Sequence, residues 1–126
     1  LIFDPANKLR LLGGTMGVEG YWGNLVVNGE NNSWTNYQLS RVPILDAVFL
    51  SKNEVLACGL ETPGDNKRSP KTVGIILRSL DGGRSWAAIY RSKATENFIS
   101  LTKVADKLYA VSDAGTFLSF ALKLVG

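Results

Sequence analysis

Short apolar segments separated by turn residues run along the whole chain, and this pattern constrains the fold more than any other feature of the sequence. No segment repeats apolar residues at spacings of three and four over several turns, as an amphipathic helix does. The segments are rich in β-branched and aromatic residues and are bounded by glycine, asparagine, aspartate and serine, which is typical of strands. We therefore predict an all-β chain of about ten or eleven strands. The expected strands include 8–14, 24–28, 33–39, 44–51, 54–60, 74–80, 85–90, 98–104, 107–113 and 116–123.

The strand pattern also repeats along the chain. Three segments each read as a strand, a polar turn and a second apolar strand, and they span 1–14, 48–60 and 101–113. Their alignment superimposes Lys8, Glu54 and Lys107, at spacings of 46 and 53 residues. Periods of this length indicate a repeat architecture in which each repeat is one supersecondary unit.

The third and fourth strands of the first two units recur as well. Segment 23–39 aligns with segment 74–90 when one residue is deleted, and this places Trp34 against Trp86. Units of four antiparallel strands are typical of propeller blades.

The sequence thus predicts a single repeat domain, 1–126, of about three antiparallel four-stranded propeller-like blades. The expected blades are 1–40, 41–92 and an incomplete third, 93–126. Three blades do not close a ring, and a propeller protects its strand edges by closing. We therefore expect either a homodimer of two such arcs or a chain that is part of a longer propeller.

The hairpin between the third and fourth strands of the middle unit carries the sequence RSLDGGRSW, residues 78–86. Ser79, Asp81, Gly83, Ser85 and Trp86 match the pattern Ser-x-Asp-x-Gly-x-Ser/Thr-Trp. This motif resembles the Asp box of the bacterial neuraminidase repeat. Its flanks are similar to the repeats of photosystem II assembly factors and sialidase-like domains. The resemblance implies a β-propeller in which the loop staples the fold, away from any active site. A compact β-sandwich or barrel with one Asp box is the alternative fold.

Physical chemistry also favours a structural role for this loop over calcium binding or catalysis. Asp81 and the serine hydroxyls can accept hydrogen bonds from backbone N–H groups that a tight loop leaves unpaired. Gly82 or Gly83 can adopt the positive φ that such a loop needs. Trp86 has the area to pack beneath the loop. The first unit has lost the motif and keeps only Ser33 and Trp34.

Composition excludes several classes of chemistry. The chain has no histidine, so it lacks the usual zinc ligand and the usual general base. We expect no metal and no cofactor. Cys58 lies alone in an apolar run and is expected to be a core cysteine. A net charge of +3 is too small to indicate a nucleic-acid partner, and no apolar run approaches the ~20 residues of a membrane span.

Candidate binding residues gather at one end of the expected sheets, where the longest loops lie. An aromatic pair beside basic side chains suits an acidic sugar, a phosphate or an acidic protein surface. Loop 14–23 contributes Tyr21 and Trp22, loop 61–73 contributes Lys67 and Arg68, and the connection 91–97 contributes Arg91.

These features favour a non-catalytic, propeller-like binding or assembly module that contacts a protein or glycan partner. The alternative is a fragment of a sialidase-like carbohydrate-active enzyme. The resemblance implies that such an enzyme would need three arginines for the substrate carboxylate, a tyrosine with a glutamate, and an aspartate acid. The sequence contains no Arg-Ile-Pro tripeptide of that family and no identifiable pair of catalytic carboxylates. We therefore expect that the chain is not an enzyme.

Overall fold

The computed structural model describes residues 2–3, 10–17, 20–28, 34–40, 42–61 and 73–121. All regular structure in these ranges is β, which confirms the predicted all-β class. None of the described segments forms a helix with the length and apolar character needed to cross a membrane.

Eleven strands lie in the described part of the chain. They are β1 (Ile2–Phe3), β2 (Arg10–Gly17), β3 (Gly20–Asn28), β4 (Trp34–Ser40), β5 (Ile44–Phe49), β6 (Val55–Glu61), β7 (Val73–Ser79), β8 (Ala87–Thr95), β9 (Phe98–Val104), β10 (Lys107–Ser112) and β11 (Phe117–Ala121).

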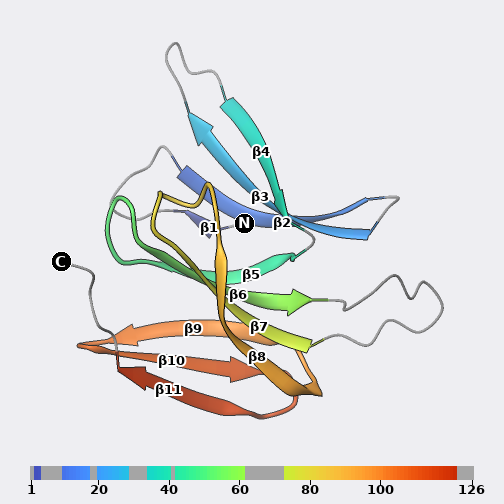
Figure 1. The fold of residues 1–126 in the computed structure, drawn as a ribbon, viewed down its shortest axis with the longest axis vertical. Helices are drawn as coiled ribbons and strands as arrows, with labels where there is room; N and C mark the ends of the chain where they lie inside the picture. The colour runs from blue at the N-terminus through green and yellow to red at the C-terminus, as the bar shows by residue number, and fades with distance from the viewer. Residues whose placement is uncertain are drawn as a thin grey trace.

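The strands form three antiparallel sheets within the described ranges, and each sheet is built from consecutive strands. Sheet one has the order β1-β2-β3-β4, sheet two has β5-β6-β7-β8, and sheet three has β9-β10-β11 (Figure 1). Because neighbouring strands alternate in direction, the connections divide between two ends. We name the end with the β4–β5 and β8–β9 connections the connecting end. The opposite end, with the β7–β8 hairpin, is the Asp81 end.

Two segments that the sequence predicts as loops are strands. Thr15 pairs with Trp22 and Gly17 with Gly20, so most of segment 14–23 is the paired tip of the β2–β3 hairpin. The β-branched and aromatic side chains of this tip favour a pleated ribbon over an open loop. Similarly, β8 continues to Thr95, which pairs with Val73. Residues 91–95 of the expected connection 91–97 therefore belong to β8, and only residues 96 and 97 connect β8 to β9.

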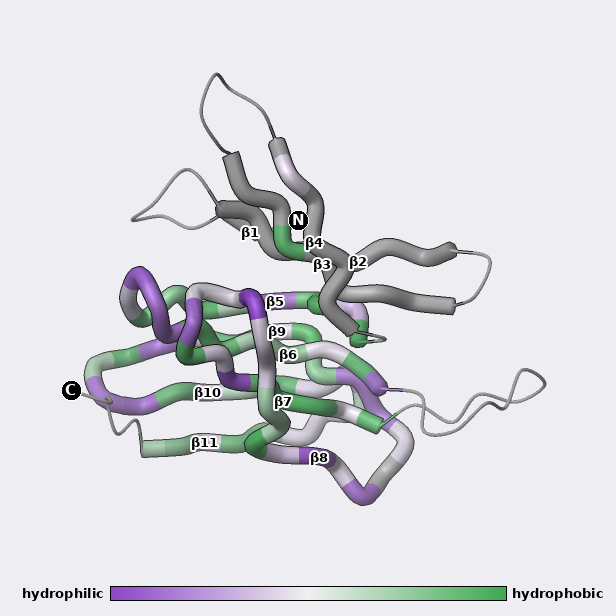
Figure 2. Tube along the Cα trace, turned by 45° about the horizontal axis from the view of Figure 1, so that its top comes forward, coloured by the Kyte–Doolittle hydropathy of each residue, from purple (hydrophilic) through white to green (hydrophobic). Residues whose placement is uncertain are grey.

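Sheets two and three stack face to face and share the largest buried cluster of the described residues (Figure 2). Tyr90 of β8 contacts the rings of both Phe98 and Phe120 in edge-on arrangements, with centroids 5.8 and 6.1 Å apart. The buried members of the cluster are Leu56, Cys58 and Ile76 from sheet two and Phe98, Leu101, Leu108 and Ala110 from sheet three. This interface is the main core of the described structure.

Cys58 is fully buried in this core, which confirms the prediction from its apolar surroundings. Its thiol donates a hydrogen bond to the carbonyl of Phe98, at 3.4 Å. Burial raises the pKa of the Cys58 thiol to about 12, and the nearby Asp46 carboxylate acts in the same direction. The side chain is thus a neutral thiol that packs as a small apolar group.

Sheet one packs on the other face of sheet two through Leu25. Leu25 is 0% exposed and lies against the buried residues Ile44, Val55 and Ala57. Sheet two is therefore covered on both faces, which explains why β6 is almost continuously buried.

A carboxylate also joins sheets two and three at their first strands. Asp46 of β5 accepts a hydrogen bond from the backbone N–H of Leu101 in β9, at 2.7 Å. Its second oxygen accepts one from the N–H of Ala47, at 2.9 Å. Because β9 is an edge strand, this side chain satisfies a donor that the ladder leaves unpaired.

Gly74 lies at a point where sheets two and three approach closely. A methyl group at Gly74 would lie 2.6 and 2.7 Å from two ring atoms of Phe98, which is itself fully buried. We therefore expect Gly74→Ala to lower the free energy of unfolding by about 1–3 kcal/mol through overpacking. Urea denaturation followed by tryptophan fluorescence measures the loss.

Phe98→Leu provides the control for this prediction. Removing part of the ring makes room for the new methyl group, so the double variant is expected to lose less stability than the two single variants together. Strictly additive losses would show that the two positions do not compete for space and would contradict the assignment.

Candidate functional site

The loop from Ser79 to Trp86 joins β7 to β8 and has the densest polar network of the described residues. Gly82 and Gly83 have φ values of 79° and 101°, which only glycine adopts without strain. Ser79 is 1% exposed, and its hydroxyl accepts hydrogen bonds from the N–H groups of Gly83, at 2.8 Å, and Asp81, at 3.3 Å. The serine thus substitutes for a backbone acceptor inside the turn.

The Asp81 carboxylate is saturated by donors of its own loop. Oδ1 accepts hydrogen bonds from the Ser79 hydroxyl, at 2.8 Å, and from the N–H groups of Arg84 and Ser85, at 3.0 and 2.9 Å. Oδ2 accepts one from the Ser85 hydroxyl, at 2.5 Å. The hydrogen bonds from the Ser85 hydroxyl and N–H are the main reason that the pKa of Asp81 falls to about 2. Asp81 is therefore an ionised acceptor that shapes the loop.

Trp86 connects this loop to two sheets. Its side chain packs against the Leu25 cluster between sheets one and two and against Ile75 and Leu77 of β7. Gly83 lies close above the Trp86 ring and the Leu25 side chain, since a Cβ there would be 3.6 Å from both. The Nε1 atom of Trp86 is buried and has no acceptor among the described residues. The loop therefore holds sheet one against sheet two.

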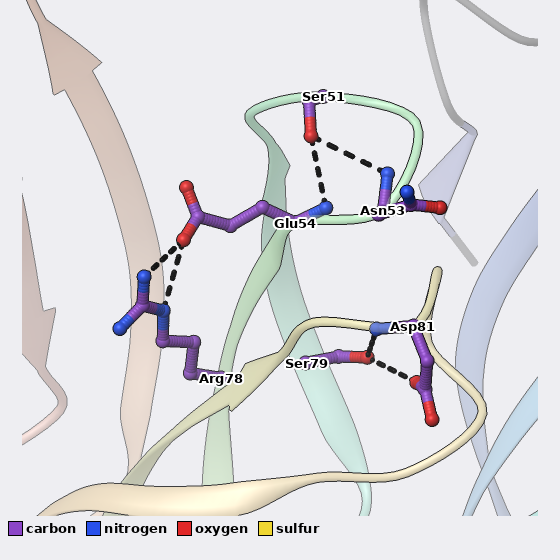
Figure 3. A network of polar contacts seen from close by, with 6 residues as sticks. All are labelled: Ser51, Asn53, Glu54, Arg78, Ser79 and Asp81. Carbon is purple, nitrogen blue, oxygen red and sulfur yellow. Dashed lines mark hydrogen bonds and ion pairs between the residues drawn. The ribbon is translucent and has the colours of Figure 1, made fainter. Parts of the chain in front are cut away.

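A second turn at the Asp81 end is tied to this loop. In the β5–β6 turn, the Ser51 hydroxyl accepts hydrogen bonds from the N–H groups of Asn53, at 3.3 Å, and Glu54, at 3.0 Å (Figure 3). The carbonyl of Asn53 accepts a hydrogen bond from the N–H of Gly82, at 2.8 Å. A backbone hydrogen bond thus joins the two turns of sheet two at this end.

Glu54 and Arg78 form a largely buried ion pair beside these turns. Both Nε and Nη2 of Arg78 donate to Oε2 of Glu54, whose side chain is only 9% exposed. Figure 3 shows the second carboxylate oxygen pointing away from the guanidinium group. The repeat pattern aligns Glu54 with Lys107 but does not identify Arg78 as the partner of Glu54. Glu54 and Arg78 are 24 positions apart, one just before β6 and the other in β7.

The ion pair borders an open cavity of about 280 Å³ between sheets two and three. Its walls are mainly apolar, and its two charges neutralise one another. The lining residues are Leu50, Glu54, Leu56, Arg78, Ile89, Leu108, Phe120 and Ala121. Such a hollow suits an apolar group better than a charged one. No group of three or more metal-ligating side chains occurs in the ranges that the structure describes.

The residues expected to bind a partner fall into three groups. Tyr21 and Trp22 lie in β3, on the paired tip of the β2–β3 hairpin and at the connecting end. Lys67 and Arg68 lie outside the described residues. Arg91 lies in β8, and its guanidinium group is paired with the carboxylate of Glu61 at 3.0 and 3.5 Å.

A third hydrogen-bonded turn lies at the connecting end of sheet three, between the expected strands 107–113 and 116–123, and the sequence did not predict its side-chain hydrogen bonds. The hydroxyl of Ser112 accepts hydrogen bonds from the N–H groups of Ala114 and Thr116, at 3.2 and 3.0 Å. Asp113 binds the N–H and side-chain amide of Asn97, at 2.9 and 2.8 Å. The sequence signal for this turn is a serine followed by an aspartate and a glycine. The buried Ser79 is likewise followed by Asp81 and Gly83 in its own loop.

Comparisons with models of known protein families, with curated protein sequences and with solved structures found no match to this chain.

The hydrogen bonding of the Asp81 carboxylate predicts how the free energy of unfolding depends on pH. Since its pKa falls from 3.8 to about 2 on folding, its stabilising contribution is complete above pH 3.8 and is lost as the pH falls towards 2. We expect Asp81→Asn to lower the free energy of unfolding at neutral pH by about 1 kcal/mol. The difference from the unsubstituted chain should then shrink below pH 3.8.

Urea midpoints measured along a pH series test this expectation. Asp106→Asn in the exposed β9–β10 turn removes the same charge and serves as the matched control. A destabilisation by Asp81→Asn that stays constant as the pH falls towards 2 would contradict the role of the ionised carboxylate.

Proposed function

We propose that this chain is a non-catalytic, propeller-like binding or assembly module of the Asp-box type, in which sheets one, two and three are successive blades. The proposal is supported by the order of the strands. Each sheet is an up-and-down meander of consecutive strands, and sheets one and two are each followed by the first strand of the next sheet. Sheets that stack face to face in this order are the building pattern of propellers.

A repeated irregularity in the first strands supports the blade assignment. In sheet two the register skips Leu45, because Ile44 pairs with Gly59 and Asp46 with Cys58. In sheet three it skips Ile99 in the same way, because Phe98 pairs with Ser112 and Ser100 with Val111. Leu45 and Ile99 are 42% and 49% exposed. Both bulges lie opposite equivalent residues of the second strand, which stand four and five positions after the aligned Glu54 and Lys107.

The observation that carries the non-catalytic role is the hydrogen bonding of Asp81. A general acid or base needs a carboxylate that is free to exchange a proton near its working pH. Asp81 accepts four hydrogen bonds within its own loop and has a pKa of about 2, so it favours the structural function of an Asp box.

The proposed contact for a protein or glycan partner is the connecting end. The β2–β3 hairpin extends from sheet one at this end and contains Tyr21 and Trp22 (Figure 1). The connection between β6 and β7 contains Lys67 and Arg68 and begins at the same end. Arg91 is the weakest member of the proposed surface, because it already binds Glu61.

Two measurements test this function. We expect the purified chain to release no fluorophore from fluorogenic glycosides of acidic and neutral sugars above a buffer blank. Steady turnover that follows the protein through purification would contradict the non-catalytic assignment and favour a sialidase-like enzyme.

A glycan array and immobilised acidic proteins then test the contact surface. We expect the variant Trp22→Ala, Lys67→Ala, Arg68→Ala to bind any ligand of the chain at least about tenfold more weakly. The variant Lys103→Ala, Lys107→Ala removes two exposed positive charges at the Asp81 end and is the matched control. A ligand that binds the triple variant as well as the unsubstituted chain would exclude the connecting end as the site.

A further inference from the structure

The face of sheet three that points away from sheet two has an exposed apolar patch. Val111 pairs directly with Phe117, and Tyr109 lies two residues before Val111, so all three side chains share this face. Phe117 is 63% exposed and Val111 is 36% exposed. The rings of Tyr109 and Phe117 contact one another, with centroids 5.5 Å apart. We call these three residues the outer face of sheet three.

The internal repeat shows what normally covers this position. The residue four positions after the aligned Lys8, Glu54 and Lys107 is Leu12, Cys58 and Val111, respectively. The strand registers pair these residues with the third strand of each sheet. Their partners are Leu25, Ile76 and Phe117. These three side chains are therefore equivalent in the three sheets.

The equivalent positions differ sharply in burial. Leu25 is 0% exposed because sheet two covers it, and Ile76 is 0% exposed because sheet three covers it. Phe117 occupies the same place in sheet three and is 63% exposed. By the pattern of the two preceding sheets, the group that fits over Phe117 is another sheet of the same repeat.

Sheet one of the chain has an apolar position of the kind that could cover the outer face of sheet three. Val55 and Ala57 of sheet two pack on Leu25, and Leu108 and Ala110 of sheet three belong to the cluster around Ile76. Ala57 and Ala110 stand three positions after Glu54 and Lys107, and Leu11 of β2 stands three positions after Lys8. Sheet one therefore has an apolar residue at the position that sheets two and three use against the preceding sheet.

We propose that the outer face of sheet three binds sheet one of a second copy of this chain. A two-fold arrangement makes the same contact twice and places six sheets in one closed ring. Six is within the usual range of propeller blades, about four to eight. The inference rests on the proposed function in treating the sheets as blades, and it names a second copy as the assembly partner.

Light scattering behind size exclusion gives the first test. We expect a mass of twice 13.7 kDa for the unsubstituted chain. Phe117→Lys is expected to weaken dimerisation by about 100-fold or more, because both contacts lose a buried ring and gain a charge. Leu80→Lys is the matched control, since Leu80 is 57% exposed but lies in the Asp81 loop, away from the outer face. This control should remain a dimer.

Mixing two variants tests the head-to-tail geometry. Leu11→Lys impairs sheet one, whereas Phe117→Lys impairs sheet three, and each alone is expected to be monomeric. Their mixture restores one intact contact, so a heterodimer should form that neither variant forms alone. Circular dichroism and urea midpoints confirm that each variant is folded. If Leu11→Lys does not fold, Leu11→Ala takes its place in the same mixing experiment.

Several outcomes would overturn the inference. A monomeric unsubstituted chain, an open ladder of larger masses, or a dimer that survives Phe117→Lys would each exclude the closed ring. Dimerisation of Leu11→Lys alone would indicate contact between two third sheets. None of these results bears on glycoside turnover or on the connecting end. Turnover by an intact dimer would conversely refute the proposed function and leave the contact in place.

Discussion

Face-to-face burial between sheets two and three is the interaction on which the rest of the structure depends. A single antiparallel sheet with one apolar face is unstable until another layer covers that face. Here Leu56, Cys58 and Ile76 meet Phe98 and its neighbours across the interface. The approach is so close that a methyl group at position 74 would lie 2.6 Å from the ring of Phe98. The mutual position of the sheets, and hence the cavity beside Glu54 and the exposure of Phe117, follows from this packing.

Polar side chains form hydrogen bonds with the backbone at the ends of the strands, whereas the faces of the sheets are apolar. Ser79 and Ser112 each satisfy two backbone donors inside a turn, and Asp81 completes its own loop without help from another sheet. Asp46 extends the same principle across an interface, because its carboxylate reaches the backbone of Leu101. Buried polar groups are costly when unpaired, and these contacts remove that cost where the ladder ends.

This separation between polar strand ends and apolar sheet faces favours the proposed function, in which the chain binds a partner through its surface. The Asp81 carboxylate accepts four hydrogen bonds within its own turn, and the charges of Glu54 and Arg78 neutralise one another. The outer face of sheet three has the opposite character. Phe117 is apolar and exposed, whereas the equivalent residues of sheets one and two, Leu25 and Ile76, are buried. In the repeat architecture that we propose, this is the side on which the next layer would dock.

The sequence by itself determined the class of the fold, the position of most strands and the chemistry of the 79–86 loop. These are local properties, since period-two patterning, turn residues and side-chain hydrogen bonds act over a few positions. Segment 14–23 was misjudged because its glycines outweighed Thr15 and Trp22, which pair in the ribbon. Only the tertiary structure decided that Arg91 binds Glu61, that Arg78 binds Glu54 and that Asp46 reaches Leu101. These partners lie 24 to 55 residues apart, so no short-range pattern encodes them. Strand pairing within sheet two brings the two ion pairs together, and stacking of sheets two and three brings Asp46 to Leu101.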